Sequence, residues 1–151
     1  MTSTANLQRR KVLAAGIAVA VVGPAMATPA EMAAAISVFT GGATPKAGRV
    51  RLDVAALVDN GNAVPISVAV ESPMSAANHV TAIAIFNERN PQTDVVKFTL
   101  GPRAGKAYVS TRIRMATSQK LMAVARMSDG SFWSGDADVI VTLAACVEGE
   151  G

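Results

Sequence analysis

Cysteine is nearly absent from this sequence. Its 151 residues contain one, Cys146, which lies five positions before the last residue. A single thiol cannot form an internal disulfide, so the fold has to be stabilised by packing rather than by cross-links. In an exported protein, an odd cysteine indicates either a disulfide to another chain or a thiol that is kept free for a chemical task.

Histidine is equally scarce, and His79 is the only one. A metal site needs several Cys, His or carboxylate ligands at close spacing, and none cluster around His79, so neither a metal nor a cofactor is expected. We interpret His79 as a loop or strand-start residue without a special role. We also expect Asp136 and Asp138 to be solvated carboxylates rather than a catalytic acid/base pair.

A phosphate-binding loop is missing too. Residues 101–105 read GPRAG, which is rich in glycine but lacks the Lys-Ser/Thr of a P-loop and has no helix after it. This segment is therefore predicted to be a turn.

Long apolar runs are limited to the N-terminus, where residues 12–30 carry no charge. Arg9, Arg10 and Lys11 precede this run, and Ala25-Met26-Ala27 has the form of a signal-peptidase site. The paired arginines followed by Leu13 indicate the twin-arginine type, which exports folded proteins. We therefore predict that residues 1–27 are a twin-arginine-type signal peptide and that the mature protein is periplasmic.

Two other interpretations of the N-terminus remain open. One is a general secretory signal, because Lys11 and Val12 match the twin-arginine pattern imperfectly. The other is an uncleaved membrane anchor, although the apolar stretch is shorter than the roughly 20 residues that a membrane-spanning helix needs.

The predicted mature chain also lacks a net charge. Loss of Arg9, Arg10 and Lys11 leaves eleven basic residues against 11 acidic ones. A nucleic-acid-binding protein would be expected to have a clustered basic face. We therefore expect neither nucleic acid nor, after cleavage of the signal, a membrane among the partners.

The segment after the signal predicts one short helix. Thr28, Pro29 and Glu31 have the spacing of a capping box with proline at the first helical position. An alanine-rich stretch follows, and Gly41-Gly42 ends it. Residues 28–48 are accordingly predicted to be a short helix and a linker.

Beyond residue 48 the apolar residues alternate with polar ones, as in strands. In residues 64–70, Val64, Ile66 and Val68 alternate with small or polar residues, and a turn containing Gly61 precedes them, with a positive φ expected at that glycine. Seven such runs occur, at residues 49–54, 64–70, 79–87, 93–100, 106–115, 120–127 and 138–144. Their even spacing predicts an all-β fold, an immunoglobulin-like β-sandwich of about seven strands.

Two further features could belong to the core or to a partner surface. Met74, Met115, Met122 and Met127 are typical core filler, but methionine also suits adaptable interfaces. Phe132 and Trp133 are adjacent, so in a strand they would face opposite ways, one into the core and the other toward a partner.

Several stretches resemble the SoxY family, the sulfur-carrier subunits of the SoxYZ thiosulfate-oxidation complex. They read DNGNAVPISVAVESPM at 59–74, FNERNPQTDVVKFTL at 86–100, GKAYVSTRIRMATSQKLMAVARMSDGSFW at 105–133 and VIVTLAAC at 139–146. The resemblance implies a non-enzymatic carrier with an immunoglobulin-like sandwich at residues 49–143 and a C-terminal arm at residues 144–151. It implies a SoxZ-like partner subunit and transient visits by Sox pathway enzymes. It also implies that Cys146 holds thiosulfate-derived intermediates covalently while those enzymes act on them.

The arm departs from the family pattern. The usual ending is Gly-Gly-Cys-Gly-Gly, whereas Ala144 and Ala145 precede Cys146 here, and Val147 and two glutamates follow it. Nearby negative charges raise a thiol pKa and repel anionic sulfur species. A diverged paralogue without carrier chemistry therefore stays an alternative, as does an exported binding module that pairs with a SoxZ-like subunit or through a disulfide.

Overall fold

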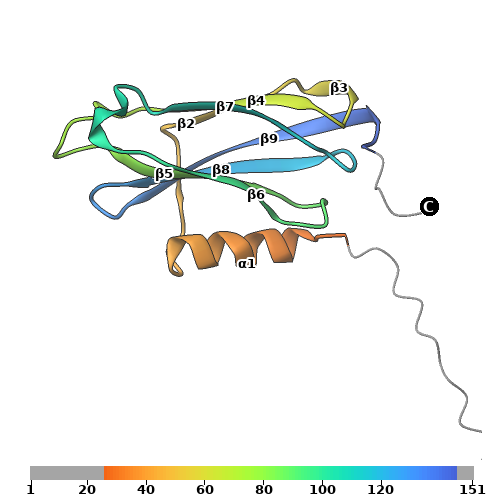
Figure 1. Ribbon diagram of the computed structural model, residues 1–151. Coiled ribbons are helices and arrows are strands. Elements are labelled where there is room, and N and C mark those ends of the chain that lie inside the picture. The colour runs from red at the N-terminus through yellow and green to blue at the C-terminus, as the bar shows by residue number, and fades with distance from the viewer. Residues whose placement is uncertain (1–25, 146–151) are drawn as a thin grey trace, which may run out of the picture.

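The computed structural model describes residues 26–145 (Figure 1). This part of the chain contains one α-helix, one 3-10 turn and nine strands. They are α1 (Pro29–Thr40), β1 (Lys46–Ala47), β2 (Val50–Asp53), β3 (Leu57–Asn60), β4 (Val64–Val70), β5 (Val80–Asn87), β6 (Asp94–Thr99), η2 (Pro102–Ala104), β7 (Tyr108–Ile113), β8 (Gln119–Met127) and β9 (Phe132–Leu143). Within residues 26–145, no helix is long and apolar enough to cross a membrane.

The predicted helix and its cap are confirmed. The Thr28 side chain accepts the Glu31 N–H at 3.3 Å, and the Glu31 carboxylate accepts the Thr28 N–H at 2.8 Å. These reciprocal bonds satisfy two backbone donors at the start of the helix. The helix ends at Gly41, whose φ of 65° is readily adopted only by glycine.

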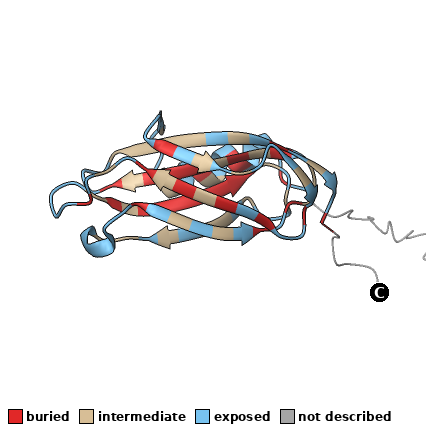
Figure 2. Cartoon of the chain, turned by 90° about the horizontal axis from the view of Figure 1, so that it is seen from above, coloured by how far each residue is buried: buried red, intermediate tan, exposed pale blue. Residues whose placement is uncertain are grey.

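The strands form two sheets packed face to face, so the predicted immunoglobulin-like sandwich is also confirmed. The larger sheet has the order β1-β9-β8-β5-β6, with β3 also paired to β9, and the smaller sheet has the order β2-β4-β7. Buried residues alternate with exposed ones along the strands (Figure 2), most clearly in β4, where Val64, Ile66 and Val68 point into the core. This period of two is what directs one face of each strand inward.

The larger sheet is buried on both faces in its central strands. Ile83 and Ile85 of β5 face the smaller sheet, whereas Ala84 and Phe86 face α1. Figure 1 shows α1 lying along the outer face of this sheet. The molecule therefore has three layers, with α1, the larger sheet and the smaller sheet stacked in that order.

Three short strands close one side of the sandwich, and two of them, β1 and β3, depart from the predicted pattern. β1 and β3 each pair in parallel with β9, and between them β2 pairs with β4 in the other sheet. β2 lies within the predicted run at residues 49–54. β1, in contrast, lies in the segment predicted to be linker, and the end of β3 overlaps the turn predicted around Gly61. β1 and β3 are too short for their periodicity to show in the sequence.

The last strand is also longer than predicted, since β9 begins at Phe132 rather than at residue 138. Phe132 packs against α1 and Trp133 against the core between the sheets, so the two aromatic residues face opposite ways, as expected. Both are half-buried, so neither is a fully exposed aromatic residue, and contact of one of them with a partner stays a prediction. The methionines are core residues as well: Met74, Met115 and Met127 are buried, and Met122 packs against α1.

The contact between α1 and the sheet can be tested with two adjacent residues. The Phe39 ring lies edge-on to Phe86 and Phe132, with 5.9 Å between centroids in each pair, whereas Val38 is 85% exposed. We expect Phe39→Ala to lower the free energy of unfolding by about 2 kcal/mol, because it leaves a cavity beneath the helix. Val38→Ala, the matched control, should change it by less than about 0.5 kcal/mol. Urea unfolding measures both, and equal effects would contradict the packing described.

Candidate functional site at the base of the C-terminal arm

The predicted site residues fall on both sides of the end of the described chain. Cys146 and Val147 lie outside the described residues. Ala144 is exposed, and Ala145, directly before the cysteine, is buried with 7% of its surface accessible. The structure therefore shows where the residue directly before Cys146 lies.

This point lies at one end of the sandwich. β9 runs the length of the larger sheet and brings the chain to the same end as the start of α1 (Figure 1). Two loops meet there, residues 88–93 between β5 and β6 and residues 114–118 between β7 and β8. We call residues 143–145, together with Gly61 and Met115, the arm base.

Backbone hydrogen bonds hold the arm base to the sandwich. The Ala145 N–H donates to Met115 O at 3.1 Å, and the Gly61 N–H donates to Leu143 O at 2.9 Å. The Met115 N–H in turn donates to Gly61 O at 2.8 Å. Three segments that are distant in the sequence are therefore joined directly, and the residue before the cysteine has a fixed position.

Gly61 is needed here for a reason other than the predicted one. A positive φ was expected, but Gly61 is not among the residues with positive φ. Instead, a Cβ at this position would overlap Met115 O and would lie 2.9 Å from the Ala145 nitrogen. Only a residue without a side chain allows the backbones to approach so closely.

A polar cluster that the sequence reading missed supports the same end of the molecule. Asn90 Oδ1 accepts hydrogen bonds from Gln119 Nε2 at 2.7 Å and from the Ala116 N–H at 3.0 Å, and Asn90 Nδ2 donates to Arg114 O at 2.7 Å. Gln119 Oε1 accepts the Arg89 N–H at 2.9 Å. These bonds tie the two loops together. Asn90-Pro91 looks like an ordinary turn in the sequence, because its partners lie 24 or more residues away.

The two loops also contribute charge. Arg89 and Arg114 are exposed residues of this end of the sandwich, and Glu88 is the acidic neighbour in the same loop. Asp94 begins β6 beside this loop, and Glu31 lies in the first turn of α1, so acidic and basic side chains are mixed at this end.

His79, Asp136 and Asp138, the other residues considered from the sequence, make contacts that stabilise the fold. His79 Nδ1 lies 3.0 Å from Ser75 O, and the backbone N–H of His79 donates to Ser128 Oγ. Asp136 and Asp138 flank Lys120, at 3.2 and 3.8 Å from its Nζ. The hydrogen bond to Asp136 and the charge of Asp138 raise the pKa of Lys120. In the part of the chain that the structure describes, no cluster of His, Cys, Asp and Glu could hold a metal.

Comparison with known proteins gives a consistent result. A family profile described as "Sulfur oxidation protein SoxY" matches residues 36–146. The solved structure of the sulfur carrier protein SoxY from Chlorobium limicola f thiosulfatophilum is 28% identical, with a TM-score of 0.63 over 76% of this chain and 98% of that one. No curated protein matches the sequence.

Two more distant structures share the fold alone. Superoxide reductase (neelaredoxin) from Ignicoccus hospitalis is 14% identical, with a TM-score of 0.57 over 62% of this chain and 80% of that one. A putative superoxide reductase from Thermotoga maritima is 17% identical, with a TM-score of 0.54 over 68% and 89%.

The close approach at the arm base predicts the effect of adding one methyl group. We expect Gly61→Ala to lower the free energy of unfolding by about 2 kcal/mol, because the new Cβ must push Met115 and Ala145 away. It should also speed hydrogen exchange at the Ala145 amide, whose bond to Met115 O is strained or broken. Gly101→Ala is the matched control, since nothing lies within 4 Å of the position that its Cβ would take and its φ is −130°. Unchanged exchange at Ala145 in the Gly61 variant would contradict the anchoring.

Proposed function

Since this chain belongs to the SoxY family of sulfur oxidation proteins, we propose that it is a periplasmic sulfur carrier that holds thiosulfate-derived intermediates on Cys146. The family and the related SoxY structure support a carrier role in sulfur oxidation. The export and the residue that carries the sulfur are parts of the proposal. In this function the protein is a substrate-bearing subunit, and partner enzymes perform the catalysis.

One observation supports the choice of Cys146 most strongly. The family match ends at residue 146, which is the only cysteine of the sequence. A covalent sulfur carrier needs a nucleophilic sulfur, and no other side chain of this protein offers one except the thioethers of methionine, which cannot form a thiolate. Met74, Met115 and Met127 are in any case buried.

The reaction expected at the thiol is an oxidation, so a partner must supply the electron acceptor. The thiolate is the reacting form, and a free cysteine has a pKa of about 8.5. Joining Cys–S⁻ to thiosulfate, S–SO₃²⁻, gives Cys–S–S–SO₃⁻ and releases two electrons, so a loading enzyme has to contain an electron acceptor. The protein itself then needs no cofactor.

The anchoring of the arm base determines how a partner enzyme could reach the thiol. Ala145 is bonded to the sandwich, so the anchored part of the chain extends to the residue directly before the thiol. A partner enzyme would therefore have to accept the end of the sandwich, with the 88–93 and 114–118 loops, close to its active site. Arg89 and Arg114 in these loops are available for contacts with anionic intermediates.

We also propose that a SoxZ-like subunit binds the sandwich. The alanine- and methionine-rich strands are weak candidates for its contact surface, because the methionines belong to the core. The turn at residues 102–105, in contrast, is exposed and stays a candidate for part of that contact.

The carrier proposal predicts a specific covalent product. We expect the protein, incubated with thiosulfate and the Sox cytochrome enzymes, to gain one thiosulfate-derived adduct on Cys146 in peptide mass spectra. The Cys146→Ser variant should gain none and should lose at least about 100-fold of thiosulfate-dependent turnover, because no other group can replace the nucleophile. An unmodified Cys146, under conditions in which a SoxY protein with the Gly-Gly-Cys-Gly-Gly ending is loaded, would overturn the proposal.

The anchored arm base favours one alternative, a diverged paralogue that keeps the fold and the partner but not the carrier chemistry. Its motivation is that Ala145 is buried and bonded where the family pattern has a glycine. Glycine there would increase the freedom of the chain before the thiol.

This alternative can be separated from the main proposal by restoring the usual ending. We expect the variant ending Gly-Gly-Cys-Gly-Gly, made through Ala144→Gly, Ala145→Gly and replacement of residues 147–151, to raise thiosulfate-dependent turnover several-fold. Circular dichroism should show an unchanged sandwich. Equal turnover of the two forms, with both loaded at the cysteine, would show that the altered arm does not limit the carrier.

A further inference from the structure

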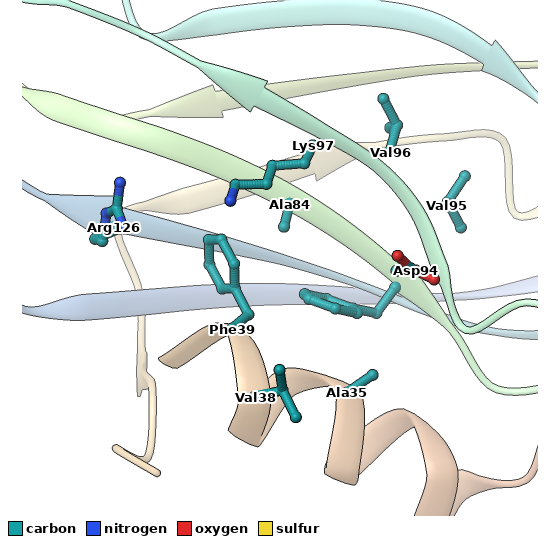
Figure 3. A pocket seen from close by; sticks show the side chains of 10 residues that line it. Ala35, Val38, Phe39, Ala84, Asp94, Val95, Val96, Lys97 and Arg126 are labelled. Carbon is teal, nitrogen blue, oxygen red and sulfur yellow. The ribbon is translucent and has the colours of Figure 1, made fainter. Parts of the chain in front are cut away.

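A groove of about 540 Å³ lies between α1 and β6 (Figure 3). Ala84 and Phe86 of β5 face α1 and form its floor. Ala35, Val38 and Phe39 line its helical side. Small-molecule sites have volumes of this order and are mostly apolar, with a few polar groups that orient the ligand. The floor and the helical wall therefore suit the apolar body of a small organic molecule.

The charged groups that line this groove are separated by sign. The strand register places Arg126, Lys97 and Asp94 beside residues 82, 84 and 86 of β5, in that order. Four residues of a strand span about 13 Å. Figure 3 shows the Lys97 side chain extending toward Arg126 and away from Asp94. The groove therefore has a positive end and a negative end, and the negative end is the one beside the 88–93 loop.

The two cations at the positive end are available to a ligand. Neither forms an ion pair with a residue that the structure describes. Lys97 is exposed, and its Nζ lies 5.6 Å from the centre of the Phe39 ring. Arg126 Nε donates to Thr81 Oγ1 at 2.9 Å, which fixes the direction of the guanidinium group. A guanidinium that is already held in place loses little further freedom when it binds a carboxylate.

The nearby end of α1 does not account for these cations. Basic side chains often bind the last carbonyls of a helix, and α1 ends one residue after Phe39. Those carbonyls have backbone partners, however. The Gly42 N–H donates to Ser37 O at 2.9 Å, and the Gly41 N–H donates to Val38 O at 3.4 Å. The positive end of the groove therefore has no evident role in capping the helix.

We propose that this groove binds an amphipathic monocarboxylate, with its carboxylate between Lys97 and Arg126 and its apolar chain over Ala84 and Phe86. Charge-assisted hydrogen bonds to the guanidinium group fix the head of the ligand. Burial of the chain against the floor supplies the hydrophobic part of the affinity. Asp94 disfavours a second negative charge at the far end, so the site selects monoanions over dianions. This site is separate from the arm base and independent of the proposed carrier role.

Octanoate is a suitable probe, and removal of each positive charge tests where its head lies. We expect an NMR titration of the protein with octanoate to give a Kd of about 1 mM or tighter, with the largest amide shifts at Ala84 and Phe86. Lys97→Met should raise the Kd about threefold. The double variant Lys97→Met/Arg126→Met should raise it about tenfold. Lys106→Met, which changes an exposed lysine in the loop before β7, is the matched control and should leave the Kd unchanged.

The shape and the negative end of the groove give two further tests. Ala35→Leu keeps a good helix former in α1 and fills part of the groove, so it should raise the Kd for octanoate about tenfold or more. Octanedioate should bind at least about fivefold more weakly than octanoate, because its second carboxylate leaves water beside Asp94. Asp94→Asn should reduce this difference between the two ligands. Circular dichroism should show the same fold in every variant.

Several outcomes would overturn the proposal. An equal Kd for the parent protein and for Lys97→Met, which changes only an exposed side chain, would show that the groove does not recognise the carboxylate. Undiminished binding to the Ala35→Leu variant would place the ligand elsewhere. Binding of the protein to phosphatidylglycerol vesicles, abolished by Lys97→Met, would make the positive end a membrane contact instead. None of these results bears on sulfur loading, which is measured at Cys146.

Discussion

The burial of β5 and β8 on both faces is the constraint on which the rest of the structure depends. Ile83 and Ile85 fill the space between the two sheets, and Ala84, Phe86 and Val124 on the reverse face need a separate apolar cover. The α1 helix provides that cover through Met32, Ile36 and Phe39. Each fully buried aliphatic or aromatic side chain stabilises the fold by about 1.5–3 kcal/mol, so the helix is an integral layer of the domain.

This layering also decides where the two ends of the described chain lie. Once α1 packs along the outer face of the larger sheet, its first residues are at the end of the sandwich where β9 finishes (Figure 1). The Ala27 N–H donates to Asn90 O at 3.2 Å, and Asn90 is the residue that also joins the two loops beside the arm base. The proposed export signal and the proposed carrier arm therefore both connect to the same end of the molecule.

In the proposed carrier, the arm is anchored to the sandwich as far as Ala145, so it is not a long flexible tether. With Ala145 held at Met115 and Gly61, the approach of a partner enzyme depends on the shape and charge of the sandwich end as much as on the arm. The exposed residues Arg89 and Arg114 lie in the loops at this end, next to the acidic residue Glu88.

Much of this architecture is determined by the sequence, because its signals are local. The capping box at Thr28 and Glu31 and the alternation in residues 64–70 depend on neighbours a few positions apart, and both predict the structure correctly. The single cysteine likewise indicates a candidate site by its rarity alone. Only the tertiary structure shows that β1 and β3 pair with β9, that Gly61 is required by contact with Met115 and Ala145, and that Asn90 and Gln119 form one cluster. These features come from residues that are distant along the chain, and no local pattern in the sequence records which distant backbone a residue will meet.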